Sequence, residues 1–153
     1  MENWSIERSV ESLPERTLII GYGNTLREDD GFGVYVARRL AKKFKAIAVR
    51  QLTPELVEAM ADFDLIIFID ANIENTPGTL AVPLASVNEP FNHSLSPRKI
   101  IALADLIYGK KTNFLIFSAG AGSLSYKEKL TPPLKKAAKT LLGFLFARLV
   151  QNR

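Results

Sequence analysis

The 153-residue chain contains no cysteine and a single histidine, His93. Without cysteine there can be no disulfide framework, no thiolate zinc site and no cysteine nucleophile. A single imidazole excludes the two-histidine zinc site of many hydrolases within one chain. A Ser-His-Asp triad would have to use His93, and the G-x-S-x-G turn that presents the serine of such a triad is missing from the sequence. These absences leave carboxylates as the main chemical groups on offer.

Long apolar runs are also missing. No run approaches the ~20 residues of a membrane-spanning helix, and the polar residues 1–16 lack the apolar centre of a signal peptide. We therefore expect no membrane partner and a cytoplasmic protein. The formal net charge is only +4, and the basic residues fall on helical spacing. Solvated helix faces are the expected reason for this charge, and DNA binding is an alternative that rests on charge alone.

The apolar residues that are present alternate between strand-like and helix-like patterns. Short, nearly continuous apolar runs are typical of strands buried on both faces of a parallel sheet, and segments with helical apolar spacing separate them. The pattern predicts strands at 17–22, 46–52, 65–70, 78–84 and 113–118. It predicts helices at 30–44, 54–61, 97–108 and from 132 to the last residues, the last three opened by Thr53, Ser96 and Thr131 as caps before proline.

This order predicts a single α/β domain over residues 17–153, preceded by a polar N-terminal extension at 1–16. The domain is expected to hold a mostly parallel, twisted sheet of about five strands with helices on both faces. The sequence shows no apolar patch outside the helical stripes, so we expect a monomer.

Three residues with metal-binding side chains fall where this fold would bring them together. Asp30 follows the first strand, Asp70 is the last residue of the third, and His93 lies in the loop before the helix that opens at Ser96-Pro97. Loops at the carboxyl ends of strands in a doubly wound sheet share one edge. Two carboxylates and one imidazole would form an open site suited to Ni, Zn, Mn or Co. Such a site could activate water or polarise a carbonyl.

Each of these residues also has a purely structural interpretation. Asp30 could favour the positive end of the helix that follows, and Asp29 could take that role or cap the helix instead. Asp70 could bind loop amides, and His93 could be a surface residue of a polar loop. The residues alone leave these alternatives open.

The glycines around the first loop favour a tight turn over a nucleotide site. G-x-G pairs at 21–23 and 31–33 permit a tight turn and close packing of strand against helix. The third glycine of a dinucleotide motif is missing, and the acids at 28–30 would repel a pyrophosphate. A second glycine-rich loop, 120–123, could bind an anion through its backbone amides.

The motifs themselves resemble those of a known family. Gly21–Gly33 is similar to the opening motif of the [NiFe]-hydrogenase maturation endopeptidases. Ile67–Ala71 resembles their second motif, a strand that ends in Asp-Ala, and His93–Pro97 their third, a histidine before a proline-initiated helix. The order and spacing agree from Thr17 to the final helix. Ile19–Arg27 together with Gln51–Leu56 is nearest to the branch that processes bidirectional, NAD-linked hydrogenases.

The resemblance implies a cytoplasmic hydrolase, an endopeptidase that removes the C-terminal extension of a [NiFe]-hydrogenase large-subunit precursor after nickel insertion. It implies that Asp30, Asp70 and His93 are the catalytic residues and metal ligands. The metal would be Ni²⁺ supplied by the substrate, for which Zn²⁺ or Cd²⁺ can substitute. A substrate groove is expected along Gly21, Gly23, Asn24 and Gly31.

Two segments depart from the family pattern. Residues 51–53 lack a carboxylate that some relatives carry, and residues 118–121 lack a proline found in others. Both departures leave the three candidate ligands intact and concern the identity of the partner hydrogenase. The alternative function is a non-enzymatic metal- or nucleotide-binding module of the same α/β fold.

Overall fold

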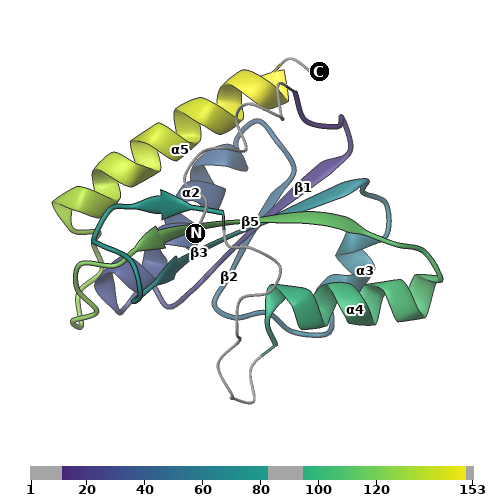
Figure 1. The fold of residues 1–153 in the computed structure, drawn as a ribbon, viewed down its shortest axis with the longest axis horizontal. Coiled ribbons are helices and arrows are strands. Elements are labelled where there is room, and N and C mark those ends of the chain that lie inside the picture. The colour runs from purple at the N-terminus through teal and green to yellow at the C-terminus, as the bar shows by residue number, and fades with distance from the viewer. Residues whose placement is uncertain (1–11, 83–94, 151–153) are drawn as a thin grey trace.

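The computed structural model describes residues 12–82 and 95–150, and it contains one five-stranded sheet in the order β2-β1-β3-β5-β4 (Figure 1). Four strands are parallel, namely β1 (Thr17–Tyr22), β2 (Ala46–Val49), β3 (Leu65–Asn72) and β5 (Asn113–Gly120). The short strand β4 (Leu80–Ala81) pairs antiparallel with β5. The prediction of a mostly parallel sheet of about five strands is confirmed.

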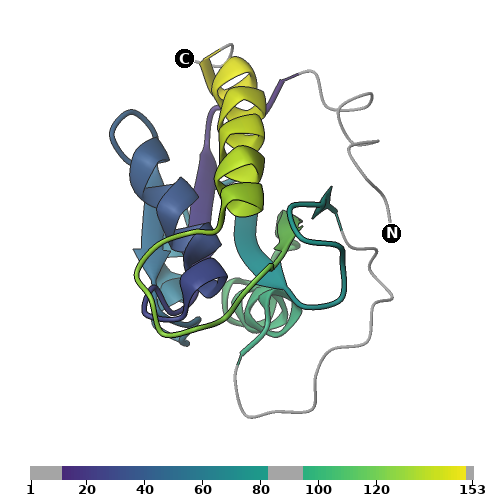
Figure 2. The same cartoon turned by 90° about the vertical axis from the view of Figure 1, so that its left-hand side faces the viewer.

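Helices cover both faces of this sheet, as the sequence predicts. The helical elements are the 3-10 turn η1 (Glu28–Gly31) and the α-helices α2 (Phe32–Leu40), α3 (Leu56–Met60), α4 (Pro97–Tyr108) and α5 (Pro132–Val150). Helices α2 and α5 lie on one side of the sheet and α3 and α4 on the other (Figures 1 and 2).

Strand β3 shows why two helical layers are needed. Its residues 65–69 are all buried, and alternate side chains of a strand point to opposite faces. Ile67 and Ile69 pack into the core under α2 and α5, whereas Ile66 and Phe68 pack into the core under α3 and α4. Burying each such side chain stabilises the fold by roughly 1.5–3 kcal/mol.

The strand order reverses direction between β1 and β3. The chain leaves β1 through α2 to reach β2 on one side, then crosses back through α3 to reach β3 on the other side of β1. Ligands of open α/β sheets bind beyond the carboxyl ends of the strands at such a switch point. The loop after β1 and the end of β3 meet at this point.

Several element boundaries differ from the sequence prediction. Strand β3 continues to Asn72, so Asp70 lies two residues before its end, because the ladder with β5 runs on to the pair Asn72 and Gly120. The helix expected at 30–44 starts as the 3-10 turn η1 and ends at Leu40, where the amides of Lys43 and Phe44 both donate to the Leu40 carbonyl. Strand β2 ends at 49, before the predicted 52.

The three Ser/Thr-Pro helix starts behave differently. Ser96 is a cap, because its Oγ accepts the Lys99 amide at 3.2 Å, and Gly109 ends the same helix with φ 64°. The prediction for Thr53 was wrong, since α3 begins at Leu56 without a side-chain cap. The Thr131 hydroxyl donates to Asp29 at 2.7 Å.

The residues before β1 contact the domain as far back as the structure describes them. Leu13 is 2% exposed within the α2/α5 core, and Arg16 pairs with Asp64 at 3.0 Å. Residues 1–11 lie outside the described part, so the boundary at residue 17 stays a prediction. No helix within 12–82 and 95–150 is long and apolar enough to cross a membrane.

Candidate active site

Glycines bring the turn after β1 into direct contact with the strand backbones. A Cβ atom on Gly21 would lie 1.9 Å from the Gly33 carbonyl oxygen, and one on Gly33 would lie 2.0 Å from the Ile69 carbonyl oxygen. Real side chains cannot approach so closely, so the start of α2 sits on β1 and β3 only because both positions are glycine. The close-packing interpretation of the G-x-G pairs is thereby confirmed for Gly21 and Gly33.

Asp30 lies in the 3-10 turn that leads into α2 and is partly exposed. Its Oδ2 accepts the Asn24 backbone amide at 2.7 Å, which closes the loop that follows β1. Its Oδ1 accepts no hydrogen bond from the described residues. One oxygen therefore stabilises the loop while the other remains available for a cation.

Asp70 projects from β3 on the face covered by α3 and α4, and its Oδ2 accepts the Tyr22 hydroxyl at 2.5 Å. The pKa of Asp70 is raised to about 6, mainly by burial and to a smaller extent by the negative charge of Asp30. Hydrogen bonding to the hydroxyls of Tyr22 and Ser118 opposes this rise in pKa. The charge of Asp30, from the turn η1, therefore acts on Asp70, from β3, at the switch point. Such interacting carboxylates are common in functional sites.

Ser118 on the neighbouring strand β5 and Asn72 on β3 itself support Asp70. Ser118 is paired with Asp70 in the β3–β5 ladder and is 3% exposed. Its Oγ accepts the Asn72 side-chain amide at 2.7 Å, which orients the hydroxyl beside Asp70. The sequence analysis missed Tyr22, Asn72 and Ser118 because only the strand register places them around one carboxylate.

Asp29 has a role that differs from the helix-end interpretation considered for it. Its side chain is fully buried and accepts from the Gly122 and Ser123 amides at 2.7 and 3.1 Å, and from the Thr131 amide and hydroxyl at 2.8 and 2.7 Å. Asp29 thus holds the β5–α5 connection against η1. Two of the amides of the 120–123 loop serve this internal carboxylate, which leaves them unavailable for an external anion.

Glu28 adds a second contact to the same connection. Its Oε1 accepts the Ser123 hydroxyl at 2.5 Å, its backbone amide donates to the Lys127 carbonyl at 2.8 Å, and its side chain is buried. Glu28 also adopts φ 46°, a left-handed conformation that is unfavourable for a residue with a Cβ. The contacts with the connection hold the turn in this conformation, directly before Asp30.

The third predicted ligand, His93, lies outside the described residues, and so does most of the loop that carries it. Within 12–82 and 95–150, no three side chains of the His, Cys, Asp and Glu types gather closely enough to hold a metal ion. The structure brings Asp30 and Asp70 to one edge of the sheet, and the three-residue site remains a prediction.

Two adjoining cavities flank the loop after β1. The first has a volume of about 160 Å³, and its lining includes Gly23 and Asn24. The second has a volume of about 270 Å³, and its lining includes Gly31. Gly21 is buried under α2 and lines neither of them. The assignment of these four residues to a substrate groove stays a prediction.

Exposed apolar side chains surround the same edge of the sheet. Leu26 follows β1, Ile73 follows β3 and Tyr126 follows β5, with exposed fractions of 50%, 79% and 82%. Because parallel strands share their carboxyl edge, the three loops emerge on the side of the molecule that carries Asp30 and Asp70. We call Leu26, Ile73 and Tyr126 the apolar rim.

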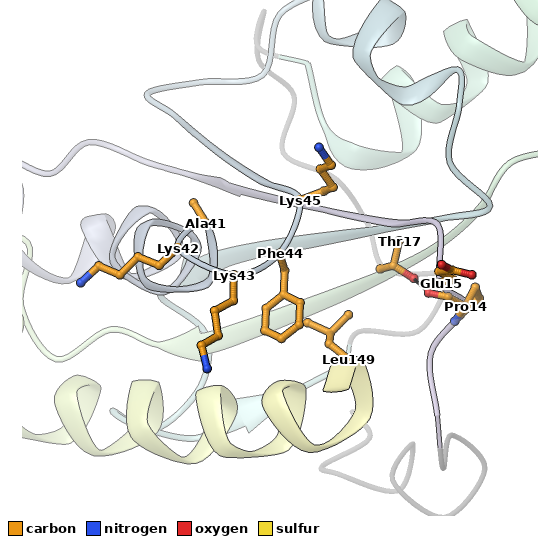
Figure 3. Close-up of a pocket in the computed structure, with 9 residues that line it drawn as sticks. All are labelled: Pro14, Glu15, Thr17, Ala41, Lys42, Lys43, Phe44, Lys45 and Leu149. Carbon is orange, nitrogen blue, oxygen red and sulfur yellow. Dashed lines mark hydrogen bonds between the residues drawn. The ribbon is translucent and has the colours of Figure 1, made fainter. Parts of the chain in front are cut away.

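A larger cavity, of about 530 Å³, lies at the opposite edge of the sheet, where β1 begins at Thr17 (Figure 3). Three lysines line it, but the ammonium groups of Lys42, Lys43 and Lys45 point in different directions. The side chains of Phe44 and Leu149 face each other between them. This cavity lacks a convergent set of polar groups and is separate from the two carboxylates, so we do not assign the site to it.

Comparison with solved structures agrees with this fold. The chain matches a [NiFe] hydrogenase maturation protease HycI from Thermococcus kodakarensis KOD1 with a TM-score of 0.77 and 27% identity, over 97% of this chain and 100% of that one. The chain is thus similar in fold and in sequence to a [NiFe] hydrogenase maturation protease. No protein-family model and no curated protein sequence matches it.

Two further solved structures show the same fold. The hydrogenase maturating endopeptidase HybD from E. coli aligns with a TM-score of 0.72 and 23% identity, over 89% of this chain and 93% of that one. An endopeptidase from Escherichia coli aligns with a TM-score of 0.67 and 25% identity over the same shares of the two chains. The resemblance to the bidirectional, NAD-linked branch stays a prediction.

Proposed function

We propose that the chain is an endopeptidase that removes the C-terminal extension of a [NiFe]-hydrogenase large-subunit precursor after nickel insertion. In this proposal Asp30, Asp70 and His93 contact the nickel that the precursor carries. The observation that supports it best is the interacting pair Asp30 and Asp70 at the switch point of a fold that matches a HycI maturation protease over 97% of the chain.

The chemistry of the two carboxylates fits a divalent cation. Carboxylate oxygens, with an imidazole, suit Ni²⁺ and also Zn²⁺ or Cd²⁺. Asp30 has an oxygen without a hydrogen-bond partner among the described residues, and a cation would relieve the repulsion between Asp30 and Asp70. When bound, such an ion supplies Lewis-acid polarisation of a water or a carbonyl. Tyr22 and Ser118 hold Asp70 in place, and the Asn24 amide holds Asp30.

The surroundings of the pair favour a protein substrate over a small molecule. The larger of the two cavities beside the loop is lined mainly by charged side chains, whereas typical small-molecule pockets are lined mainly by apolar ones. The apolar rim offers exposed side chains on three loops around the site, and grouped exposed apolar residues mark protein contacts. A folded precursor can cover such a surface while its tail enters the site.

The proposal is tested by incubating a nickel-loaded large-subunit precursor with wild-type protein, Asp30→Asn, Asp70→Asn or His93→Ala, and following the precursor mass. We expect the wild type to shorten the precursor. Each variant should be slower by more than ~100-fold, beyond the 10–100-fold typical of residues that only support a ligand. Circular dichroism should show all variants folded.

Asp62→Asn is the matched control, because Asp62 is an exposed carboxylate on the loop before β3. It should cleave at the wild-type rate. If all three site variants still trim the precursor, the site assignment is wrong. If the wild type binds metal but leaves the precursor at full length, the chain is a non-enzymatic metal-binding module.

A further inference from the structure

A basic surface borders the candidate active site on both sides of Thr25. Thr25 and Arg38 line both of the adjoining cavities, so the two form one continuous depression. Arg50, just beyond β2, lines the smaller cavity, and Arg39, Lys129 and Lys135 line the larger one. We call this depression, with its five basic residues Arg38, Arg39, Arg50, Lys129 and Lys135, the basic groove.

The positive charge of the basic groove is not neutralised by the chain itself. Across 12–82 and 95–150, the ion pair found is that of Arg16 with Asp64, elsewhere on the molecule. Two acids, Glu28 and Glu128, also line the larger cavity. Glu28 is buried and accepts a hydrogen bond from the Ser123 hydroxyl, so its carboxylate is already occupied. Five basic side chains therefore face one exposed acid.

The groove differs from an ordinary solvated basic surface in how its residues are arranged. Arg38 and Arg39 come from α2, Arg50 follows β2, Lys129 lies in the β5–α5 connection and Lys135 in α5, yet all line one depression. By contrast, the lysines of the opposite edge point apart (Figure 3). Positive charge gathered from separate elements into a groove favours an anionic partner.

We propose that the basic groove binds an acidic segment of the precursor protein, next to the bond that is cut. This inference rests on the proposed function and names the chemistry by which the substrate is recognised. Arg guanidinium groups bind carboxylates through paired hydrogen bonds, and exposed charges of this kind steer association. Asn24 and Gly31 line the groove and neighbour Asp30 in the fold, so a bound segment enters directly beside the carboxylates.

The carboxylates also distinguish a peptide from a nucleic acid. Asp30 and Asp70 repel a continuous phosphate backbone that runs past the end of the groove. A peptide can place its acidic side chains in the groove and keep neutral residues beside Asp30 and Asp70.

A binding experiment on the full chain tests the groove without requiring activity. Calorimetry at low salt compares a hexaglutamate peptide with a hexaglutamine peptide, using wild type, Arg38→Glu/Arg50→Glu and the control Lys42→Glu/Lys43→Glu. Both double variants change the net charge equally, and Lys42 and Lys43 lie at the opposite edge. We expect selective binding of hexaglutamate, weakened ~10-fold or more by the groove variant and less than ~2-fold by the control.

Three results would overturn the inference. The first is that neither peptide binds, and the second is that both double variants weaken binding equally, which would reflect net charge alone. The third is that a mixed-sequence DNA duplex binds more tightly than hexaglutamate with the same dependence on Arg38 and Arg50, which would assign the groove to nucleic acid.

Cleavage kinetics separate failure of this inference from failure of the proposed function. If the wild type is active, the groove variant should have a ~10-fold higher KM for the nickel-loaded precursor with little change in kcat. Raising the salt concentration from about 50 to 300 mM should likewise raise the KM of the wild type ~10-fold. An active wild type with equal KM for both double variants overturns the inference alone. A wild type that never cleaves overturns the proposed function. The peptide experiment alone then tests whether the basic groove binds acidic segments.

Discussion

Glu28, Asp29 and Asp30 are consecutive acids with different sets of hydrogen-bond partners. Glu28 accepts from the Ser123 hydroxyl, Asp29 accepts from Gly122, Ser123 and Thr131, and Asp30 accepts from Asn24 and keeps one oxygen free of described hydrogen bonds. Only the conformation of the 3-10 turn separates a buried structural carboxylate from a partly exposed one. Adjacent acidic residues thus have different roles: Glu28 and Asp29 support the turn, and Asp30 belongs to the candidate site.

We predict that Asp29→Asn destabilises the protein by ~2–4 kcal/mol. The Asp29 carboxylate is the acceptor in all four of its hydrogen bonds. The side-chain amide of asparagine would turn its own NH₂ group toward at least one of these donors. A buried polar group left without a partner costs roughly 1–3 kcal/mol, and more where a charge is involved. Urea unfolding measures the change.

Asp64→Asn is the control for Asp29→Asn. It removes the ion pair between Arg16, whose side chain is 63% exposed, and Asp64, whose side chain is 52% exposed. Such exposed pairs contribute little to stability. Equal losses for the two variants would contradict the anchoring role of Asp29.

Asp70→Asn should stabilise the protein at neutral and alkaline pH but not at acid pH. The pKa of Asp70 is raised from 3.8 to about 6 on folding, so the folded protein retains a proton that the unfolded chain releases. The stability that this carboxyl provides is present below pH ~4 and lost as pH rises through ~6, by at most ~3 kcal/mol. Asparagine still accepts from Tyr22 and escapes this loss.

Unfolding free energies of wild type and Asp70→Asn at pH 4, 6 and 8 check this expectation. Because Asp70 is partly exposed, we expect a gain of ~1–2 kcal/mol at pH 8 that shrinks to nothing at pH 4. A gain that does not change with pH would show that ionisation of Asp70 is not its cause.

At the scale of elements, the start of α2 depends on glycine backbones that touch two strands. Gly33→Ala places a methyl group 2.0 Å from the Ile69 carbonyl oxygen. We expect a loss of ~2–4 kcal/mol, at or above the upper end for overpacking, because backbone rather than a flexible side chain must move. Thermal unfolding measures it.

Gly143→Ala provides the matched control in α5. It lies within the helix, is exposed, and has no heavy atom within 4 Å of the added Cβ. Alanine in an exposed helix interior is favoured over glycine by up to ~1 kcal/mol. The two substitutions should therefore have opposite signs, and a stabilising Gly33→Ala would contradict the packing described for α2.

The sequence predicted elements best where local chemistry decides them. Strand β1 spans the predicted 17–22, and Ser96 caps α4 as expected because its partner is Lys99, three residues away. Thr131 carries the same Thr-Pro signal, but its hydroxyl donates to Asp29, 102 residues earlier in the chain. No local pattern contains such a distant partner, and the same reason explains the extension of β3 by its ladder with β5.

At the scale of the whole molecule, topology predicted that Asp30 and Asp70 lie close together but not which residues support Asp70. Asp30 and Asp70 could be assigned to one edge because carboxyl ends of parallel strands meet there. Tyr22 and Ser118 could not, since their contact with Asp70 depends on strand register. The contribution of His93 remains a prediction. The basic groove was equally hidden, because its residues are far apart along the chain and converge only through packing.

The contacts of Asp29 also set an order of events during synthesis. Its carboxylate accepts hydrogen bonds from donors 93, 94 and 102 residues further along the chain. A nascent chain that has not yet emerged past Thr131 has no partners for Asp29, and so the turn that presents Asp30 lacks its anchor. Forming contacts of such long separation is slow. The turn that presents Asp30 is therefore anchored only after the chain has emerged past Thr131, and a shorter nascent chain carries Asp30 on an unanchored turn.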